Sequence, residues 1–172
     1  MKFVFLDYET TGLIPEAHSL LEVSARVLDE KFGETGVRYH SLIRPNIGAA
    51  AASDTYAMAM HRDSGLFEDA LYCQQTPEIV EQELFDLLSP LAPGLVLAGN
   101  SIHFDRGFMA RHMPRLDKLF GHRMLDVSAM MLGIQFLTGG DPLSYEKKRA
   151  HRSEDDLDET IAELRHYQKH IV

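Results

Sequence analysis

Residues 2–12 read KFVFLDYETTG, an apolar run that is followed by two acids, two threonines and a glycine. A short run rich in Phe and Val is typical of a buried strand, which we expect to cover residues 2–6 and to stop at Asp7. In an extended chain, residues i and i+2 project from the same face, so the carboxylates of Asp7 and Glu9 point at one place. Because like charges repel, a hard divalent cation bound through oxygen is their simplest partner. Taken alone, this spacing also fits a solvated turn.

The chain has 172 residues, enough for one compact domain with a sizeable core. Hydrophobic residues make up 45% and charged residues 25%, which excludes collagen-like, low-complexity and largely disordered chains. The longest uncharged apolar stretches, 91–99 and 129–134, are far shorter than the roughly 20 residues that cross a bilayer, so no membrane association is expected. Acids interrupt the apolar opening before a signal-peptide core forms, and the only cysteine, Cys73, cannot form an intrachain disulfide. We therefore expect a cytoplasmic protein.

The charge balance bears on the partners of the protein. Lysine and arginine number 17 against 26 aspartates and glutamates, a formal net charge of −9. Proteins that follow many phosphates usually carry a basic face and gain affinity from counterion release. The acidic balance therefore argues against long nucleic acid as the main ligand and leaves short ligands open.

Periodicity predicts the order of elements along the chain. Alternation of apolar and polar residues predicts half-buried strands at 21–27 and 37–43, joined by a hairpin turn between Gly33 and Gly36. After short helices and loops at 46–72, helices and strands alternate: helix 77–89, strand 95–98, helix 101–113, strand 123–127, helix 128–136, a mobile loop at 138–148, and helix 153–167. This order predicts an α/β fold in which one mixed sheet lies between helices, in a single domain spanning residues 1–172.

Helix phase singles out Asp105. In a helix capped by Asn100 or Ser101, it shares a face with Phe108 and Met109, so its carboxylate leans toward the apolar side. A buried carboxylate needs a partner. The alternative is an acid near a helix N-terminus that the macrodipole favours.

The last helix contributes Asp156 and, just before it, His151. At about 100° per residue Asp156 borders the buried stripe, whereas Asp155 points to water. Ser153 and Asp156 also have the spacing of a capping box. The position of His151 allows its ring to lie beside Asp156, but an ordinary surface histidine shows the same pattern.

Three segments together resemble the motifs of the DEDDh exonuclease superfamily. They are DYETTGL at 7–13, NSIHFD at 100–105, and His151 five residues before Asp156. More narrowly, GNSI at 99–102, LDVS at 125–128 and AEL at 162–164 with Tyr167 resemble the oligoribonuclease family. The resemblance covers nearly the whole chain and implies a ribonuclease-H-like mixed sheet flanked by helices on both faces.

The resemblance also implies a mechanism. Asp7, Glu9, Asp105 and Asp156 would bind two Mg²⁺ or Mn²⁺ ions, and His151 would be the general base for an attacking water. Two metal ions can stabilise both oxygens of an in-line phosphodiester displacement, and a histidine titrates close to neutral pH. The expected activity is 3′→5′ hydrolysis of short oligoribonucleotides to 5′-mononucleotides.

The family's substrate-binding positions map onto this chain as well. A leucine that wedges between bases, an aromatic residue, a histidine, and a cap around the 5′ side of the substrate correspond to Leu13, Tyr56, His61, Ser101, His122, Arg123 and Ser128. His122 stands where the family has a tyrosine that the partner subunit of a homodimer contributes. The implied partners are a second copy of the chain and single-stranded RNA of two to about five nucleotides.

Two other readings remain open from the sequence. Thr10 completes a Glu-Thr-Thr-Gly run that is more typical of DNA polymerase proofreading exonucleases, which predicts activity on longer single strands. A module that binds without catalysis is a different class, and the presence of all five expected catalytic residues argues against it. A phosphoacceptor domain is disfavoured by length and by the lack of adjacent acids after the first strand.

Overall fold

The computed structural model of the chain describes residues 1–46, 54–140, 145 and 152–169. Five strands form one sheet in the order β3-β2-β1-β4-β5. They span Lys2–Thr10 (β1), Leu20–Leu28 (β2), Glu34–Leu42 (β3), Leu95–Gly99 (β4) and Met124–Asp126 (β5). Strand β2 is antiparallel to both β1 and β3, whereas β4 runs parallel to β1 and β5 parallel to β4. The predicted mixed sheet is confirmed.

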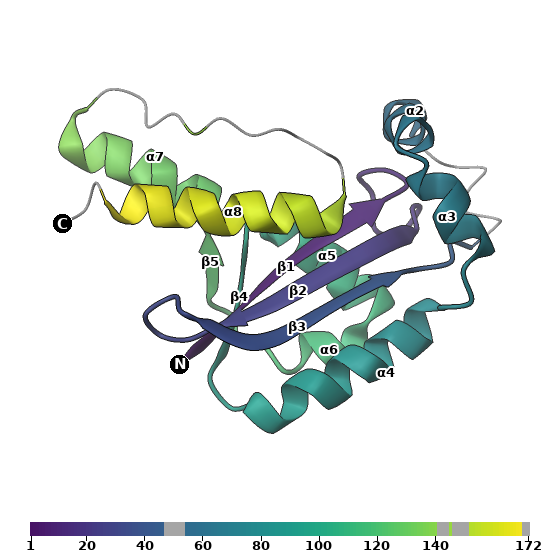
Figure 1. Cartoon of the computed structure of the whole chain (residues 1–172), viewed down its shortest axis with the longest axis horizontal. Coiled ribbons are helices and arrows are strands. Elements are labelled where there is room, and N and C mark those ends of the chain that lie inside the picture. Colours follow the sequence, from purple (N-terminus) through teal and green to yellow (C-terminus); the bar gives the residue numbers. More distant parts are fainter. Residues whose placement is uncertain (47–53, 141–144, 146–151, 170–172) are drawn as a thin grey trace.

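Helices cover both faces of this sheet (Figure 1). One face carries α4 (Pro77–Leu88), α5 (His103–His112) and α6 (Pro114–Asp117), and the other carries α7 (Val127–Thr138) and α8 (Ser153–Gln168). Helices α2 (Thr55–Asp63) and α3 (Leu66–Tyr72) lie beyond the end of β1 and the start of β2, and the short 3₁₀ helix η1 (Ser89–Leu91) follows α4. None of the helices in the described ranges is long and apolar enough to span a membrane.

Strand β1 divides its side chains between the two layers. Val4, Leu6 and Tyr8 pack into the core beneath α4, α5 and α6, while Phe3 and Phe5 pack into the core beneath α7 and α8. Since the side chains of a strand alternate between its faces, the next residues on the α8 side are Asp7 and Glu9. The same face is thus apolar at the start of β1 and acidic at its end.

The first strand is longer than expected. The prediction that it stops at Asp7 was wrong, because β1 continues to Thr10 while pairing with β2, with Asp7 opposite Ser24 and Glu9 opposite Glu22. The two acids are therefore held rigidly in the ladder, and the turn begins only at Thr11.

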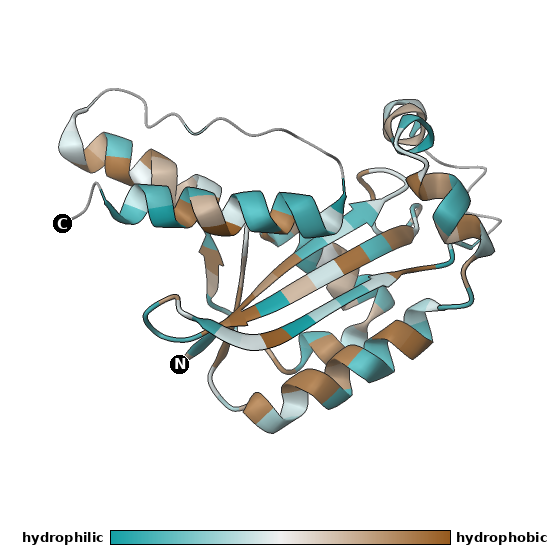
Figure 2. Ribbon diagram, viewed as in Figure 1, coloured by the Kyte–Doolittle hydropathy of each residue, from teal (hydrophilic) through white to brown (hydrophobic). Residues whose placement is uncertain are grey.

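The second strand is buried on both faces, so the expectation of a half-buried strand was wrong. Its polar residues Glu22, Ser24 and Arg26 face α8, whose first turns are hydrophilic (Figure 2). Glu22 and Ser24 are each only 1% exposed. The predicted hairpin turn also shifts, since residues 29–33 connect β2 to β3 and Gly36 lies within β3.

Both predicted helix caps were wrong, because neither N-cap residue makes a side-chain capping bond and the side chains of Asn100 and Ser153 bond to distant residues instead. The N-cap position of α5 is Ile102, while Asn100 donates to Thr160 on α8. The N-cap position of α8 is Arg152, and Ser153 shares a hydrogen bond of 2.8 Å with Ser24 instead of capping its own helix. The predicted loop at 138–148 lies largely outside the described residues.

Candidate active site

Three of the expected acids converge at the end of β1. Asp7, Glu9 and Asp156 each offer a carboxylate oxygen, and these three atoms lie within 4.8 Å of one another. The first two come from adjacent positions on one face of β1, and the third comes from the first turn of α8. As the helix phase predicts, Asp156 is half-buried whereas Asp155 is exposed.

Glu9 is a buried acid surrounded by other acids. Its burial, followed by the negative charges of Asp7, Asp156 and Glu22, raises the pKa of Glu9 to about 9. A divalent cation among these oxygens reverses the balance, because it favours the ionised form of every carboxyl around it.

Asp105, the fourth expected acid, approaches from the other layer but is not one of the three acids whose oxygens lie within 4.8 Å of one another. It lies on α5, is 4% exposed, and accepts a hydrogen bond of 2.9 Å from the backbone N–H of Tyr8, the residue between the two acids of β1. Burial and then the charge of Asp7 raise the pKa of Asp105 well above its ordinary value. Phe108 and Met109 are fully buried on its face of the helix, as the sequence predicts.

The donor set fits divalent cations. Carboxylate oxygens are the ligands that Mg²⁺ and Mn²⁺ prefer, and the atoms of Asp7, Glu9 and Asp156 are close enough to share an ion. Among the described residues this is the group of acids assembled closely enough to hold a metal. His151, the expected general base, lies outside the described residues.

The expected base-contacting residues lie around the loop that follows β1. Leu13 is 70% exposed and Tyr56, on α2, is 78% exposed. His61 is different, since it is 1% exposed and its Nε2 lies 2.9 Å from the Thr10 carbonyl oxygen and 3.6 Å from Glu9 Oε2. The geometry places this histidine against the acidic cluster rather than on the surface.

The expected cap residues flank the start of β5 and α7. Ser101 is exposed and its backbone N–H donates to Asp126 Oδ1 at 3.2 Å. Ser128 donates to Asn100 Oδ1 at 2.8 Å, which ties this region to the β4–α5 loop. His122 and Arg123 are exposed in the segment before β5.

The sequence reasoning missed two buried acids that hydrogen-bond to distant segments. Glu22 accepts hydrogen bonds from Arg152 and from the backbone of Ser153, and buried Glu163 accepts one of 2.8 Å from Asn100. Glu22 falls at a polar position of the alternating strand pattern, so the sequence gives no sign that α8 buries it.

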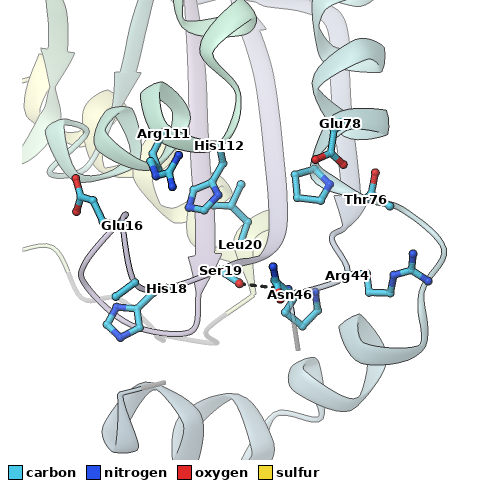
Figure 3. Close-up of a pocket in the computed structure, with 13 residues that line it drawn as sticks. Glu16, His18, Ser19, Leu20, Arg44, Asn46, Thr76, Glu78, Arg111 and His112 are labelled. Atoms are coloured by element: carbon cyan, nitrogen blue, oxygen red, sulfur yellow. Dashed lines mark hydrogen bonds between the residues drawn. The ribbon is translucent and has the colours of Figure 1, made fainter. Parts of the chain in front are cut away.

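The loop after β1 is itself held by polar contacts. His18 Nδ1 accepts from the N–H of Ile14, and Thr11 and Ser19 exchange two hydrogen bonds of 2.9 Å. Beside the loop opens a hollow of about 490 Å³, with Arg111 and His112 on one side and Arg44 on the other (Figure 3). Its described lining contains none of the four acids, so it is not the place where they act.

The chain is similar to known exonucleases along nearly its whole length. The family model RNase_T, described as an exonuclease, matches residues 4–164. An oligoribonuclease of Neisseria meningitidis serogroup B is 32% identical over 170 residues, which cover 98% of this chain and 91% of the relative. One from Francisella tularensis subsp. holarctica is 30% identical over 171 residues, with 98% and 95% covered.

Solved structures of exonuclease I share the fold. The enzyme from Methylocaldum szegediense has a TM-score of 0.73 at 16% identity, and 98% of this chain is covered. The zinc-bound E. coli enzyme in complex with single-stranded DNA has a TM-score of 0.71 at 17% identity, again with 98% of this chain covered. The chain spans 40% of either exonuclease I chain. The fold predicted from the sequence is thus confirmed.

Proposed function

The chain belongs to the RNase_T exonuclease family, and on that premise we propose that it is a metal-dependent 3′→5′ exoribonuclease that degrades short oligoribonucleotides to 5′-mononucleotides. The observation that carries the proposal is the convergence of Asp7, Glu9 and Asp156, with Asp105 beside them, at the end of a central strand. The oligoribonuclease relatives, similar over nearly the whole chain, support the short substrate. The activity is assigned to one exonuclease domain spanning residues 1–172.

The four carboxylates would hold two Mg²⁺ or Mn²⁺ ions. Such ions, when bound, stabilise the incoming and departing oxygens of an in-line phosphodiester displacement. The chain itself fixes the ligands: the β1–β2 ladder orients Asp7 and Glu9, and the N–H of Tyr8 orients Asp105. The role assigned to His151 is to accept a proton from the attacking water.

Substrate binding is assigned to the exposed groups around the acids. Leu13 and Tyr56 present apolar surface to solvent at this end of the sheet, which suits stacking on bases. His61, which contacts the Thr10 carbonyl oxygen and Glu9, is assigned to support the acidic cluster. The cap is assigned to Ser101, Ser128, His122 and Arg123, where the planar guanidinium can hold a phosphate through two hydrogen bonds.

A homodimer is part of the proposal. Helix α7 exposes Leu132, Phe136 and Leu137, which are 60%, 86% and 82% accessible, and Met124 on the edge strand β5 is 38% accessible. Large apolar side chains that gather on one exposed element are typical of an interaction site. If this surface packs against a second copy, His122, two residues before Met124, would lie near the interface between the subunits.

The location proposed is the cytoplasm, which suits the free Cys73.

The test is cleavage of 5′-labelled RNA of two, four and twenty nucleotides in Mn²⁺ or Mg²⁺, with a chelator control. The proposal predicts that the dinucleotide is consumed far faster than the twenty-nucleotide strand and that the chelator stops the reaction. Equal or faster cleavage of the long strand contradicts it and supports the proofreading or trimming activity that Thr10 suggests. Binding without metal-dependent cleavage would identify a binding module.

A further inference from the structure

Glu22 is a buried carboxylate that the chemistry above does not use. It is 1% exposed, lies opposite Glu9 in the β1–β2 ladder, and therefore shares the sheet face that carries Asp7 and Glu9. Its own charge contributes to the raised pKa of Glu9. A further acid this close to the four proposed metal ligands either binds the metal itself or affects those ligands indirectly.

The contacts of Glu22 show that it is committed elsewhere. Oε1 accepts from Arg152 Nη2 at 2.8 Å, from Arg152 Nε at 3.1 Å and from His40 Nε2 at 3.0 Å, and Oε2 accepts from the backbone N–H of Ser153 at 2.8 Å. Burial alone would raise the pKa of Glu22, but the hydrogen bonds from Arg152, His40 and Ser153 outweigh it and hold this pKa below its ordinary value. The positively charged side chain of Arg152 thus neutralises Glu22.

These contacts act on the start of α8. Arg152 at the N-cap position makes no local capping bond with its side chain, and the carboxylate of Glu22 takes over that role by accepting from Ser153 N–H. The first turn is then closed by the N–H of Asp156, which donates to the Arg152 carbonyl at 3.0 Å. A fixed Arg152 therefore fixes the turn that carries Asp156.

The neighbouring residues of β2 continue the same attachment. Ser24 bonds to Ser153 at 2.8 Å, and Arg26 forms an ion pair with Asp158. Alternate residues of one strand thus hold the first two turns of α8 through polar bonds, which have directional requirements that apolar packing lacks. Glu22 is the member of this row that lies opposite a proposed metal ligand.

We propose that Glu22 is a positioning residue for the metal site: through Arg152 and the first turn of α8, it sets the place of Asp156 relative to Asp7 and Glu9. The inference rests on the proposed function, because it concerns the same acids. Residues that orient metal ligands in this way are commonly worth tenfold to a hundredfold in metal affinity.

The experiment measures Mn²⁺ binding to the full chain without substrate, by calorimetry or by the paramagnetic resonance signal of free Mn²⁺, well below the melting temperature. Positioning predicts that Glu22→Gln and Arg152→Gln each weaken binding by about tenfold to a hundredfold, and that the double variant is little worse than either single variant. Cleavage at limiting Mn²⁺ falls in the same proportion and recovers as Mn²⁺ is raised.

The substitution Arg152→Gln distinguishes the loss of positioning from a direct electrostatic effect of Arg152 on the bound cation. A through-space effect predicts that loss of this positive charge tightens cation binding, whereas loss of positioning weakens it. The matched control is Arg165→Gln, which removes a 3.1 Å ion pair with Glu34 at the far end of α8 and should leave Mn²⁺ affinity unchanged. Arg152 is about one third exposed, so its substitution tests the idea even if Glu22→Gln does not fold.

The outcomes are distinguishable. If the wild type binds Mn²⁺ and cleaves RNA, but Glu22→Gln and Arg152→Gln bind Mn²⁺ as the wild type does, with only a lowered melting temperature, Glu22 is merely structural and the inference is wrong. Tighter binding by Arg152→Gln also overturns it. If the wild type itself neither binds Mn²⁺ nor cleaves, the proposed function fails and the inference fails with it.

Discussion

The substitution Glu9→Gln should stabilise the metal-free protein while removing its activity. The pKa of Glu9 is about 9 in the folded chain against an ordinary 4.5. Because the folded pKa is raised, the folded state is favoured fully below about pH 4.5 and loses this advantage as the pH rises toward 9. At pH 8 the unfolded chain has released the proton and the folded chain retains it, a cost of about 5 kcal/mol at 1.36 kcal/mol per pKa unit. Glutamine has no proton to lose and escapes this cost.

The assay is urea unfolding in chelator at pH 5, 6.5 and 8. The stability advantage of Glu9→Gln should grow with pH and approach about 5 kcal/mol at pH 8. The matched control is Glu16→Gln, at an exposed glutamate, which should change stability by no more than about 0.5 kcal/mol at every pH. With Mn²⁺ present the order should reverse, since metal binding stabilises the wild type. An advantage that is independent of pH, or a variant less stable than the wild type at pH 8, would refute this reasoning.

Further predictions concern packing, assembly and substrate binding. Gly99→Ala should destabilise the fold by about 1–3 kcal/mol in urea unfolding, because the new Cβ would lie 2.9 Å from the Leu6 carbonyl oxygen; an unchanged midpoint would contradict the close approach. Phe136→Ser should shift the protein from dimer to monomer in analytical ultracentrifugation without loss of stability, as the ring is 86% exposed in the single chain; a persistent dimer would place the interface elsewhere. Tyr56→Ala should raise KM for a dinucleotide by about fivefold to a hundredfold with little change in kcat, since base stacking is worth about 1–3 kcal/mol.

The sequence predicts the fold because each element carries its own period. The alternation in residues 21–27 and the helical spacing of Leu157, Ile161 and Leu164 both survive in the structure as β2 and α8. The pairing of Asp7 with Glu9 follows from the two-residue period of a strand, and the half-buried position of Asp156 follows from helix phase. These are local properties, so a single sequence is enough to find them.

The features that the sequence did not predict depend on contacts between segments that are distant in the sequence. Glu22 and Ser24 look like the solvent face of β2 until α8 covers them, and Ser153 looks like a helix cap until Ser24 becomes its partner. Polar side chains choose between local and distant partners according to the tertiary geometry, which periodicity does not encode. For the same reason the role of Arg152 became visible only in the structure.

The most direct test of the central claim is the initial rate of 5′-mononucleotide release from a four-nucleotide RNA in saturating Mn²⁺, compared between the wild type and Asp156→Asn. If the acids hold the catalytic metal ions, the initial rate of Asp156→Asn should be lower than that of the wild type by at least about a hundredfold, because the metal ions supply several kcal/mol of transition-state stabilisation. The variant should remain folded, because Asp156 is only half-buried. A folded Asp156→Asn protein that releases mononucleotides at the wild-type rate would contradict the account.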